Sequence, residues 1–153
     1  MARLKTIKED GKTTFALLID HSVGVKGRNR RDDVQLIQFL LNSANKNGVS
    51  PFAQKLSEDL KMDGICGPKT IAAIRLYQKT INEFSHDTLV EDGTINASEK
   101  RSFSRGGHIL NTAIGHLNFY FRSIFEHQIR KAWGNQPLTD AILEPLVKMH
   151  LLP

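Results

Sequence analysis

An internal repeat constrains this chain more than any other feature of its sequence. When the sequence is shifted by 40 residues, Gln38 falls on Gln78 and Asn42 falls on Asn82. The same shift pairs Gly27 with Gly67, Val34 with Ile74, Leu36 with Leu76, Ile37 with Tyr77 and Leu41 with Ile81. Helical periodicity accounts for the apolar pairs but not for the glycine, glutamine and asparagine pairs. We therefore expect two repeat units, each a glycine loop followed by a helix; the alternative is two unrelated amphipathic helices.

Apolar spacing and turn residues predict where the two helices lie. Asp32 or Asp33 is a suitable N-cap for the first helix, which should end at Asn47-Gly48. Its apolar stripe comprises Val34, Ile37, Leu40, Leu41 and Ala44. Pro68 stands at the first position of the second helix, where its missing N–H costs nothing. The stripe of that helix comprises Ile71, Ile74, Tyr77 and Ile81. Asp63-Gly64 and Asp92-Gly93 predict turns, the second resembling the start of a truncated third unit.

The flanking segments complete a single domain, 1–153, that we expect to be mostly α. Asp10-Gly11 predicts an N-terminal β-hairpin within 1–21 that covers one flank of the helical core. Residues 22–96 hold the repeat core. Apolar spacing from 102 to 133 predicts a longer helix, and 138–152 a short one. Residues 97–153 would then form a C-terminal helical extension of the bundle.

Composition excludes several classes of protein. The 153 residues are 40% apolar and 24% charged, values typical of a globular domain rather than of a disordered or collagen-like chain. The net charge of +5 favours an acidic partner without requiring one. A single cysteine, Cys66, forbids an internal disulfide. The longest apolar run near the N-terminus, Phe15 to Ile19, is too short for a signal-peptide core or a membrane span. We expect synthesis in the cytoplasm without a signal peptide and no membrane insertion.

Three segments carry a resemblance to a known family. They read SVGVKGRNRRDDVQLIQFLL, DGICGPKTIAAIRLYQ and EDGTI, and together they cover about 22–96. They resemble the peptidoglycan-binding-like domain found beside bacterial and phage cell-wall hydrolases. The resemblance implies a three-helix bundle that binds the glycan or the stem peptides of the wall without catalysis. Two departures stand out: the interval between the repeats is long, and 97–153 does not look like a hydrolase domain.

The candidate ligand-binding residues lie in the loops and on the polar faces of the two repeat units. They are Asn29, Arg30, Gln38, Asp63, Thr70, Arg75, Tyr77 and Gln78. Arginine suits the carboxylates of stem peptides, because it can form paired charge-assisted hydrogen bonds with them. We expect a shallow polar groove between the repeat helices. Some of these residues also have a structural explanation: Asp63 can bind N–H groups of its own turn, Thr70 can bond back into the loop, and Tyr77 falls on the apolar stripe.

Other constellations of reactive residues point to no catalytic or metal centre. The six histidines form no paired ligand motif, so we expect no metal and no cofactor. Cys66 has no histidine beside it in the sequence and is expected to pack as a small thiol. Four cations, Lys26, Arg28, Arg30 and Arg31, crowd one loop. They suit a phosphate contact to nucleic acid or teichoic acid, or else form a solvated loop. No helix-turn-helix pattern accompanies them, so we do not expect nucleic acid.

The sequence predicts a non-enzymatic protein that binds peptidoglycan. Without an export signal, it would reach the periplasm or wall through a phage lysis route or a secretion machine, or tethered to a separately encoded hydrolase or toxin. The first alternative is a helical adaptor that kept the fold without the wall ligand. Its mark would be an apolar patch on the extension, formed by Phe103, Phe119, Tyr120 and Trp133. A small wall hydrolase with an unrecognised site is the second alternative.

Overall fold

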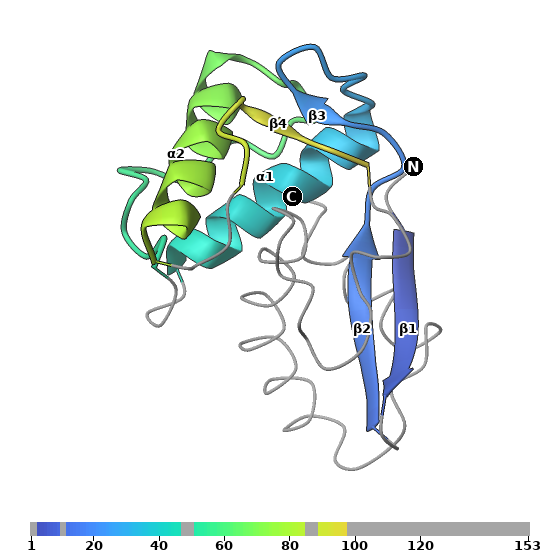
Figure 1. The fold of residues 1–153 in the computed structure, drawn as a ribbon. Coiled ribbons are helices and arrows are strands. Elements are labelled where there is room, and N and C mark those ends of the chain that lie inside the picture. Colours follow the sequence, from blue (N-terminus) through green and yellow to red (C-terminus); the bar gives the residue numbers. More distant parts are fainter. Residues whose placement is uncertain (1–2, 10–11, 47–50, 85–88, 98–153) are drawn as a thin grey trace.

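The computed structural model describes residues 3–9, 12–46, 51–84 and 89–97 (Figure 1). Two α-helices and two small two-stranded sheets make up this part of the chain. The described fold is therefore mostly helical with an N-terminal hairpin, as the sequence predicts. The Asp10-Gly11 and Asn47-Gly48 turns, and the helices expected within 98–153, lie outside the described residues. No helix in the described part is both long and apolar enough to cross a bilayer.

The N-terminal hairpin forms as predicted. Strand β1 (Arg3–Glu9) pairs antiparallel with β2 (Lys12–Leu18), in a register that joins Arg3 to Leu18 and Glu9 to Lys12. The expected covering of the helical core is not seen among the described residues, because the hairpin runs away from both helices (Figure 1). Strands of seven residues span roughly 23 Å, which allows them to project beyond the core. Ile19, directly after β2, is fully buried and ties the hairpin to the helical part.

Helix α1 (Arg31–Lys46) begins earlier than the expected aspartate cap. The N–H of Val34 donates to the carbonyl of Arg30 at 2.9 Å, so Arg30 occupies the N-cap position. Asp33 does not cap the helix because its buried carboxylate holds another segment. It accepts the N–H groups of Asp20 at 3.3 Å and of His21 at 3.2 Å. Asp32 Oδ1 accepts the N–H of Asp33 at 3.1 Å, but from within the first turn of the helix. The sequence analysis was therefore wrong on the N-cap position, and Asp33 instead anchors α1 to the chain that leaves the hairpin.

Helix α2 (Pro68–Phe84) begins at Pro68, as predicted, and contributes Ile74, Tyr77 and Ile81 of its expected stripe to the core it shares with α1. The fourth stripe residue, Ile71, is only half-buried and does not belong to this core. The core side chains on the two helices are Val34, Leu36, Ile37, Leu40, Leu41, Ala44, Ala73, Ile74, Tyr77 and Ile81. Tyr77 is fully buried, and its ring meets Phe52 edge-to-face with centroids 5.2 Å apart. Phe52 comes from the connector between the helices, so this connector contributes to the core as well.

The start and the end of the repeat core meet in a second small sheet. Strand β3 (Val23–Gly24) pairs antiparallel with β4 (Thr94–Ile95), and the two lie side by side in Figure 1. The N–H of Val25 donates to the carbonyl of Gly93 at 3.1 Å, which extends this contact. Val23 and Ile95 are both buried. The predicted turn at Asp92-Gly93 therefore closes the repeat core against its own first loop.

Candidate functional site

The repeated glutamines build the centre of each unit. Gln38 projects from α1, and its Nε2 lies 3.1 Å from each of three acceptors, Asp63 Oδ1, the carbonyl of Ile65 and Thr70 Oγ1. Its Oε1 accepts the N–H of Gly64 at 3.0 Å. One buried amide therefore joins α1, the Asp63-Gly64 turn and the first turn of α2. We call this arrangement a glutamine clasp.

The second unit repeats the clasp 40 residues later. Gln78 Nε2 donates to the carbonyl of Thr94 at 2.9 Å and to Asp92 Oδ1 at 3.3 Å, and its Oε1 accepts the N–H of Gly93 at 2.9 Å. The two asparagines behave alike as well. Asn42 exchanges two hydrogen bonds with the backbone of Leu60, as Asn82 does with Leu89. The sequence repeat is thus a repeat of structure, which excludes the alternative of two unrelated helices.

Each clasped turn depends on a glycine. Gly64 has a φ of +73°, and an added Cβ would lie 2.4 Å from Cγ of Arg31. Gly93 has a φ of +75° and lies under the side chain of Arg75. At Gly67 a side chain would meet no obstacle, since nothing lies within 4 Å of a Cβ placed there. Gly67 precedes α2, where its carbonyl accepts the N–H of Ile71 at 3.1 Å.

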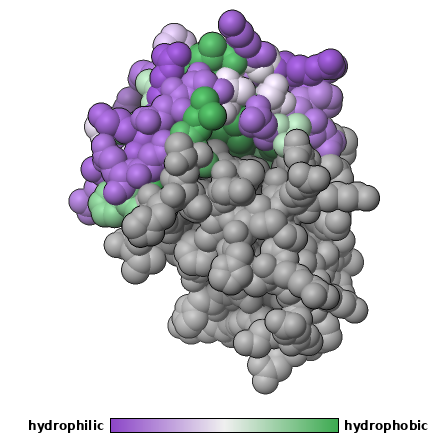
Figure 2. Space-filling model, in the orientation of Figure 1, coloured by the Kyte–Doolittle hydropathy of each residue, from purple (hydrophilic) through white to green (hydrophobic). Residues whose placement is uncertain are grey.

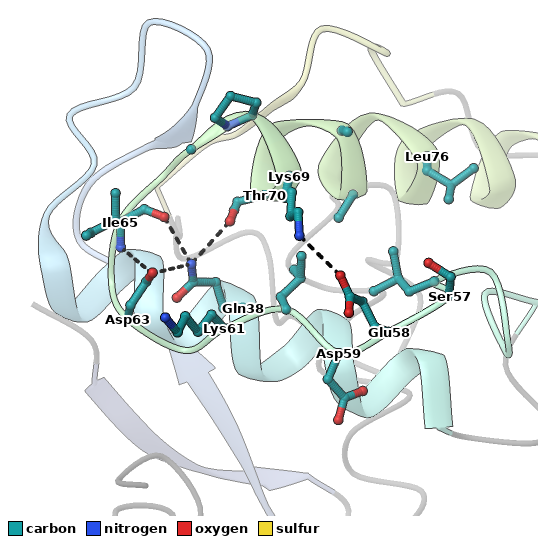
Figure 3. A pocket seen from close by; sticks show the side chains of 16 residues that line it. Gln38, Ser57, Glu58, Asp59, Lys61, Asp63, Ile65, Lys69, Thr70 and Leu76 are labelled. Atoms are coloured by element: carbon teal, nitrogen blue, oxygen red, sulfur yellow. Dashed lines mark hydrogen bonds and ion pairs between the residues drawn. The ribbon is translucent and has the colours of Figure 1, made fainter.

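A groove of about 740 Å³ runs between α2 and the connector that precedes it (Figure 3). Gln38 lies in its wall, together with Asp63 and Thr70 of the clasp. The apolar lining residues are Leu56, Leu60, Ile65, Pro68, Ala72, Ala73 and Leu76. The charged ones are Glu58, Asp59, Lys61, Asp63 and Lys69. The lining of the groove therefore combines apolar side chains with charged side chains of both signs.

Ion pairs border this groove. Lys69 of α2 reaches Glu58 of the connector at 3.1 Å, and the pair is drawn in Figure 3. Lys46 of α1 pairs with Asp59 at 2.7 Å. All four side chains are largely exposed, so the pairs contribute little to stability and can be rearranged by a charged ligand.

On the face shown in Figure 2, the described residues are predominantly hydrophilic. Among the residues with described side chains, the large exposed apolar ones are Ile65, Phe84 and Val90. Ile65 is 67% exposed and belongs to the clasped turn, where it lines the groove. An aliphatic side chain held open to solvent at the edge of a groove is available for contact with a ligand.

Two titratable groups of the clasped turn have shifted pKa values. The N–H of Ile65, 2.9 Å from Asp63 Oδ1, lowers the pKa of the Asp63 carboxyl, and the hydrogen bond from Gln38 lowers it further. Asp63 is therefore a carboxylate at neutral pH. Burial raises the pKa of the Cys66 thiol, which packs against the core. A raised pKa disfavours the thiolate, so Cys66 fits the expected packing role rather than that of a nucleophile.

The structure brings together three of the eight sequence-predicted site residues at the groove: Gln38, Asp63 and Thr70. Gln78 and Arg75 lie instead at the Asp92-Gly93 turn, which we call the third turn because it begins the truncated third unit. Tyr77 is in the core. Asn29 holds the first loop, where its side chain bonds Gly24 and Gly27. The expected groove between the two repeat helices is thus replaced by one between α2 and the connector, because core side chains fill the interface of the helices.

The sequence analysis missed the connector as part of the site. Leu56, Glu58 and Lys61 line the groove, yet no motif or periodicity marks them. Their placement follows from Asn42 and Asn45, which bind the backbone of Leu60 and Leu56. These asparagines were the available signal, since a polar residue on the inner face of an amphipathic helix needs a partner.

Among the described residues no cluster of three or more His, Cys, Asp or Glu side chains could hold a metal ion. Comparisons with protein-family models, with curated proteins and with solved structures give no match for this chain.

Proposed function

We propose that this protein binds bacterial peptidoglycan without catalysis, in a peptidoglycan-binding-like bundle whose binding site is the groove beside α2. The observation that carries the proposal is the groove itself, built by the DGICGPKT segment on which the family resemblance rests. Gln38 positions this segment and Ile65 is presented at its edge. A repeating wall polymer supplies many copies of the ligand, so a shallow groove can bind through avidity.

The lining of the groove favours the stem peptide over the glycan. No aromatic side chain lines it, whereas sugar rings are commonly held by the faces of aromatic rings. Stem peptides combine small apolar side chains with free carboxylates and amines. Ala72 and Leu76 suit the methyl groups, while Lys61, Lys69 and Glu58 suit the charged ones.

Co-sedimentation with insoluble sacculi tests the proposal when the groove is blocked by a single substitution. Ala72 is exposed on α2 and lines the groove, so Ala72→Trp fills it without disturbing the core. Lys79→Trp places the same side chain on an exposed position of α2 outside the groove. We expect saturable pelleting of the unmodified protein at moderate salt, at least tenfold weaker pelleting of Ala72→Trp, and unchanged pelleting of Lys79→Trp.

Other outcomes would point elsewhere. If Arg75→Ala weakens pelleting and Ala72→Trp does not, the binding site lies at the third turn rather than in the groove. No pelleting at all would leave the helical adaptor as the leading function; its marker residues Phe103, Phe119, Tyr120 and Trp133 lie outside the described residues. Release of dye from labelled sacculi would indicate a hydrolase. If the protein pellets, we propose that a separately encoded wall hydrolase or toxin is its partner and that a non-classical route delivers it.

A further inference from the structure

The first loop of the repeat core displays a set of exposed cations. Lys26, Arg28, Arg30 and Arg31 are all exposed. The ion pairs of the described part join other residues, His21 to Asp33, Lys46 to Asp59 and Lys69 to Glu58. None of the four cations therefore has its charge neutralised by a neighbouring carboxylate of the described chain. We call these four residues the basic loop.

The backbone of the basic loop is held in place by a dense set of hydrogen bonds. Asn29 Oδ1 accepts the N–H of Gly24 at 2.8 Å, and its Nδ2 donates to the carbonyls of Gly24 and Gly27 at 3.1 and 3.2 Å. Ser22 receives the N–H groups of Arg28 and Asn29. Lys26 and Asn29 adopt left-handed φ values of 58° and 51°. These bonds fix where each cation leaves the loop, which reduces the entropy lost when a ligand is bound.

The basic loop also belongs to the rigid body of the fold. Its base is paired with β4, and the hydroxyl of Thr94 donates to the carbonyl of Val25. At its other end, the stem of Arg31 lies against Gly64, so its aliphatic carbons are part of the packing. Lys26, Arg28 and Arg30 are therefore the cations to which we assign the ligand contacts, since the stem of Arg31 also serves the packing of the turn.

We propose that the basic loop is a second binding site, separate from the groove, for the phosphodiester groups of an anionic polymer that carries no bases. The guanidinium groups of Arg28 and Arg30 can each bind two oxygens of a phosphate, and Lys26 adds a point charge. Successive phosphates of one polymer would occupy the successive cations. The site does not depend on recognition of peptidoglycan.

Three observations favour such a polymer over nucleic acid and over a membrane. Single-stranded nucleic acids stack on exposed aromatic rings. Of the large exposed apolar side chains in the described part, the aromatic one is Phe84. It lies at the last residue of α2, roughly 24 Å along the helix from the first residue, Pro68. Insertion of the start of α1 into a DNA groove would bring the exposed carboxylate of Asp32 against the phosphates. A membrane surface calls for several exposed apolar side chains beside the cations, whereas the large ones with described side chains are Ile65, Phe84 and Val90.

Binding of the full chain to fluorescent poly(glycerol phosphate), measured over a salt series, tests this site. The Arg28→Gln/Arg30→Gln variant removes two loop charges, whereas Lys55→Gln/Lys79→Gln removes two exposed charges elsewhere. We expect at least tenfold weaker binding for the first and less than twofold for the second. The slope of log K against log salt should fall by about 1.4–1.8 in the loop variant alone.

Further arms keep the proposal falsifiable. The Arg28→Lys/Arg30→Lys variant should bind more tightly than the glutamine variant but more weakly than the unmodified protein, because it keeps both charges and loses the paired contacts. Ala72→Trp should bind poly(glycerol phosphate) normally even if it abolishes pelleting with sacculi. Equal weakening by both glutamine variants, or no binding at low salt, would overturn the proposal. Tighter binding to single-stranded DNA of equal charge, or to vesicles of anionic lipid, would replace the polymer by that ligand.

Discussion

At the scale of single residues, two buried glutamines organise the repeat core. Gln38 and Gln78 are 1% and 2% exposed, and each holds a turn through both ends of its amide. A buried amide is costly unless its hydrogen bonds are made, and here the turn supplies the partners. These side chains are therefore part of the framework that shapes the groove, rather than its principal ligand contacts.

Replacing Gln38 by leucine should destabilise the protein strongly. The substitution keeps the volume similar but leaves the N–H of Gly64 and the carbonyl of Ile65 without their partner. We expect a loss of about 2–4 kcal/mol in the free energy of unfolding. Gln35→Leu, which removes a hydrogen bond to the carbonyl of Met62 from a half-buried position of the same helix, should cost about 1 kcal/mol or less. Urea unfolding measures the free energies of unfolding of both variants. Equal losses would contradict the role assigned to Gln38 in the clasp.

The lowered pKa of Asp63 predicts a dependence of stability on pH. Its folded pKa lies below the unfolded value of 3.8, so the stabilisation is complete above about pH 4. It is lost as the pH falls through the folded pKa. Urea unfolding between pH 5 and pH 2 should show a steeper loss for the unmodified protein than for Asp63→Asn. Identical pH profiles would show that the carboxylate is not held by Ile65 and Gln38.

Cys66 should react slowly. Because burial raises the pKa of its thiol, the thiolate is less populated than in an unfolded chain. At pH 8, we expect iodoacetamide to alkylate the folded protein at least several-fold more slowly than the urea-unfolded protein. Faster alkylation of the folded form would indicate an activated thiol and would reopen the hydrolase alternative.

At the scale of elements, the turns impose the strictest requirements on backbone conformation. The helices supply the surface against which the turns pack. Gly24 has a φ of +125°, and an added Cβ would lie 2.0 Å from the carbonyl oxygen of Gly93. This close approach permits the first loop to meet the third turn. At Gly67, by contrast, the space around an added Cβ is open.

Alanine at these two glycines should therefore have very different effects. We expect Gly24→Ala to lower the free energy of unfolding by about 3 kcal/mol or more, because both its φ and its contact with Gly93 are incompatible with a side chain. Gly67→Ala should change it by less than about 1 kcal/mol. Thermal unfolding of the two variants provides the comparison, and similar shifts in Tm would be inconsistent with this packing.

At the scale of the whole molecule, the third turn completes the fold. Ile95 is 1% exposed and pairs with Val23, so it joins the end of the repeat core to its beginning. Val90, five residues earlier, is 73% exposed. The described part is thus closed by a contact between residues far apart in the chain.

Shortening the side chain of Ile95 to that of alanine should destabilise the entire repeat core. We expect Ile95→Ala to cost about 2–4 kcal/mol, and Val90→Ala less than about 0.5 kcal/mol. Amide hydrogen exchange should show faster exchange at Val25 and at the first turn of α1 in Ile95→Ala alone, because closure holds them together. Faster exchange confined to residues 92–95 would mean that the third turn does not stabilise the rest of the repeat core.

Much of this fold could be predicted from local patterns. The stripe positions of α1, those of α2 apart from Ile71, the start of α2 at Pro68, the hairpin and the glycine turns depend on spacing and backbone preference, which act over a few residues. The cap of α1 could not be predicted, since Asp33 is recruited by Asp20 and His21. Long-range contacts likewise give structural roles to proposed ligand residues, among them Asn29, Gln38, Gln78 and Tyr77.

The sequence by itself determined the repeat, because matching glutamines, asparagines and glycines at a spacing of 40 residues demand matching surroundings. It also determined which faces of the helices are buried. Only the tertiary structure decided where the groove lies and which charges border it. Glu58 and Lys69 meet because Asn42 and Asn45 hold the connector beside α2, and such long-range hydrogen bonds leave no periodic trace in the chain.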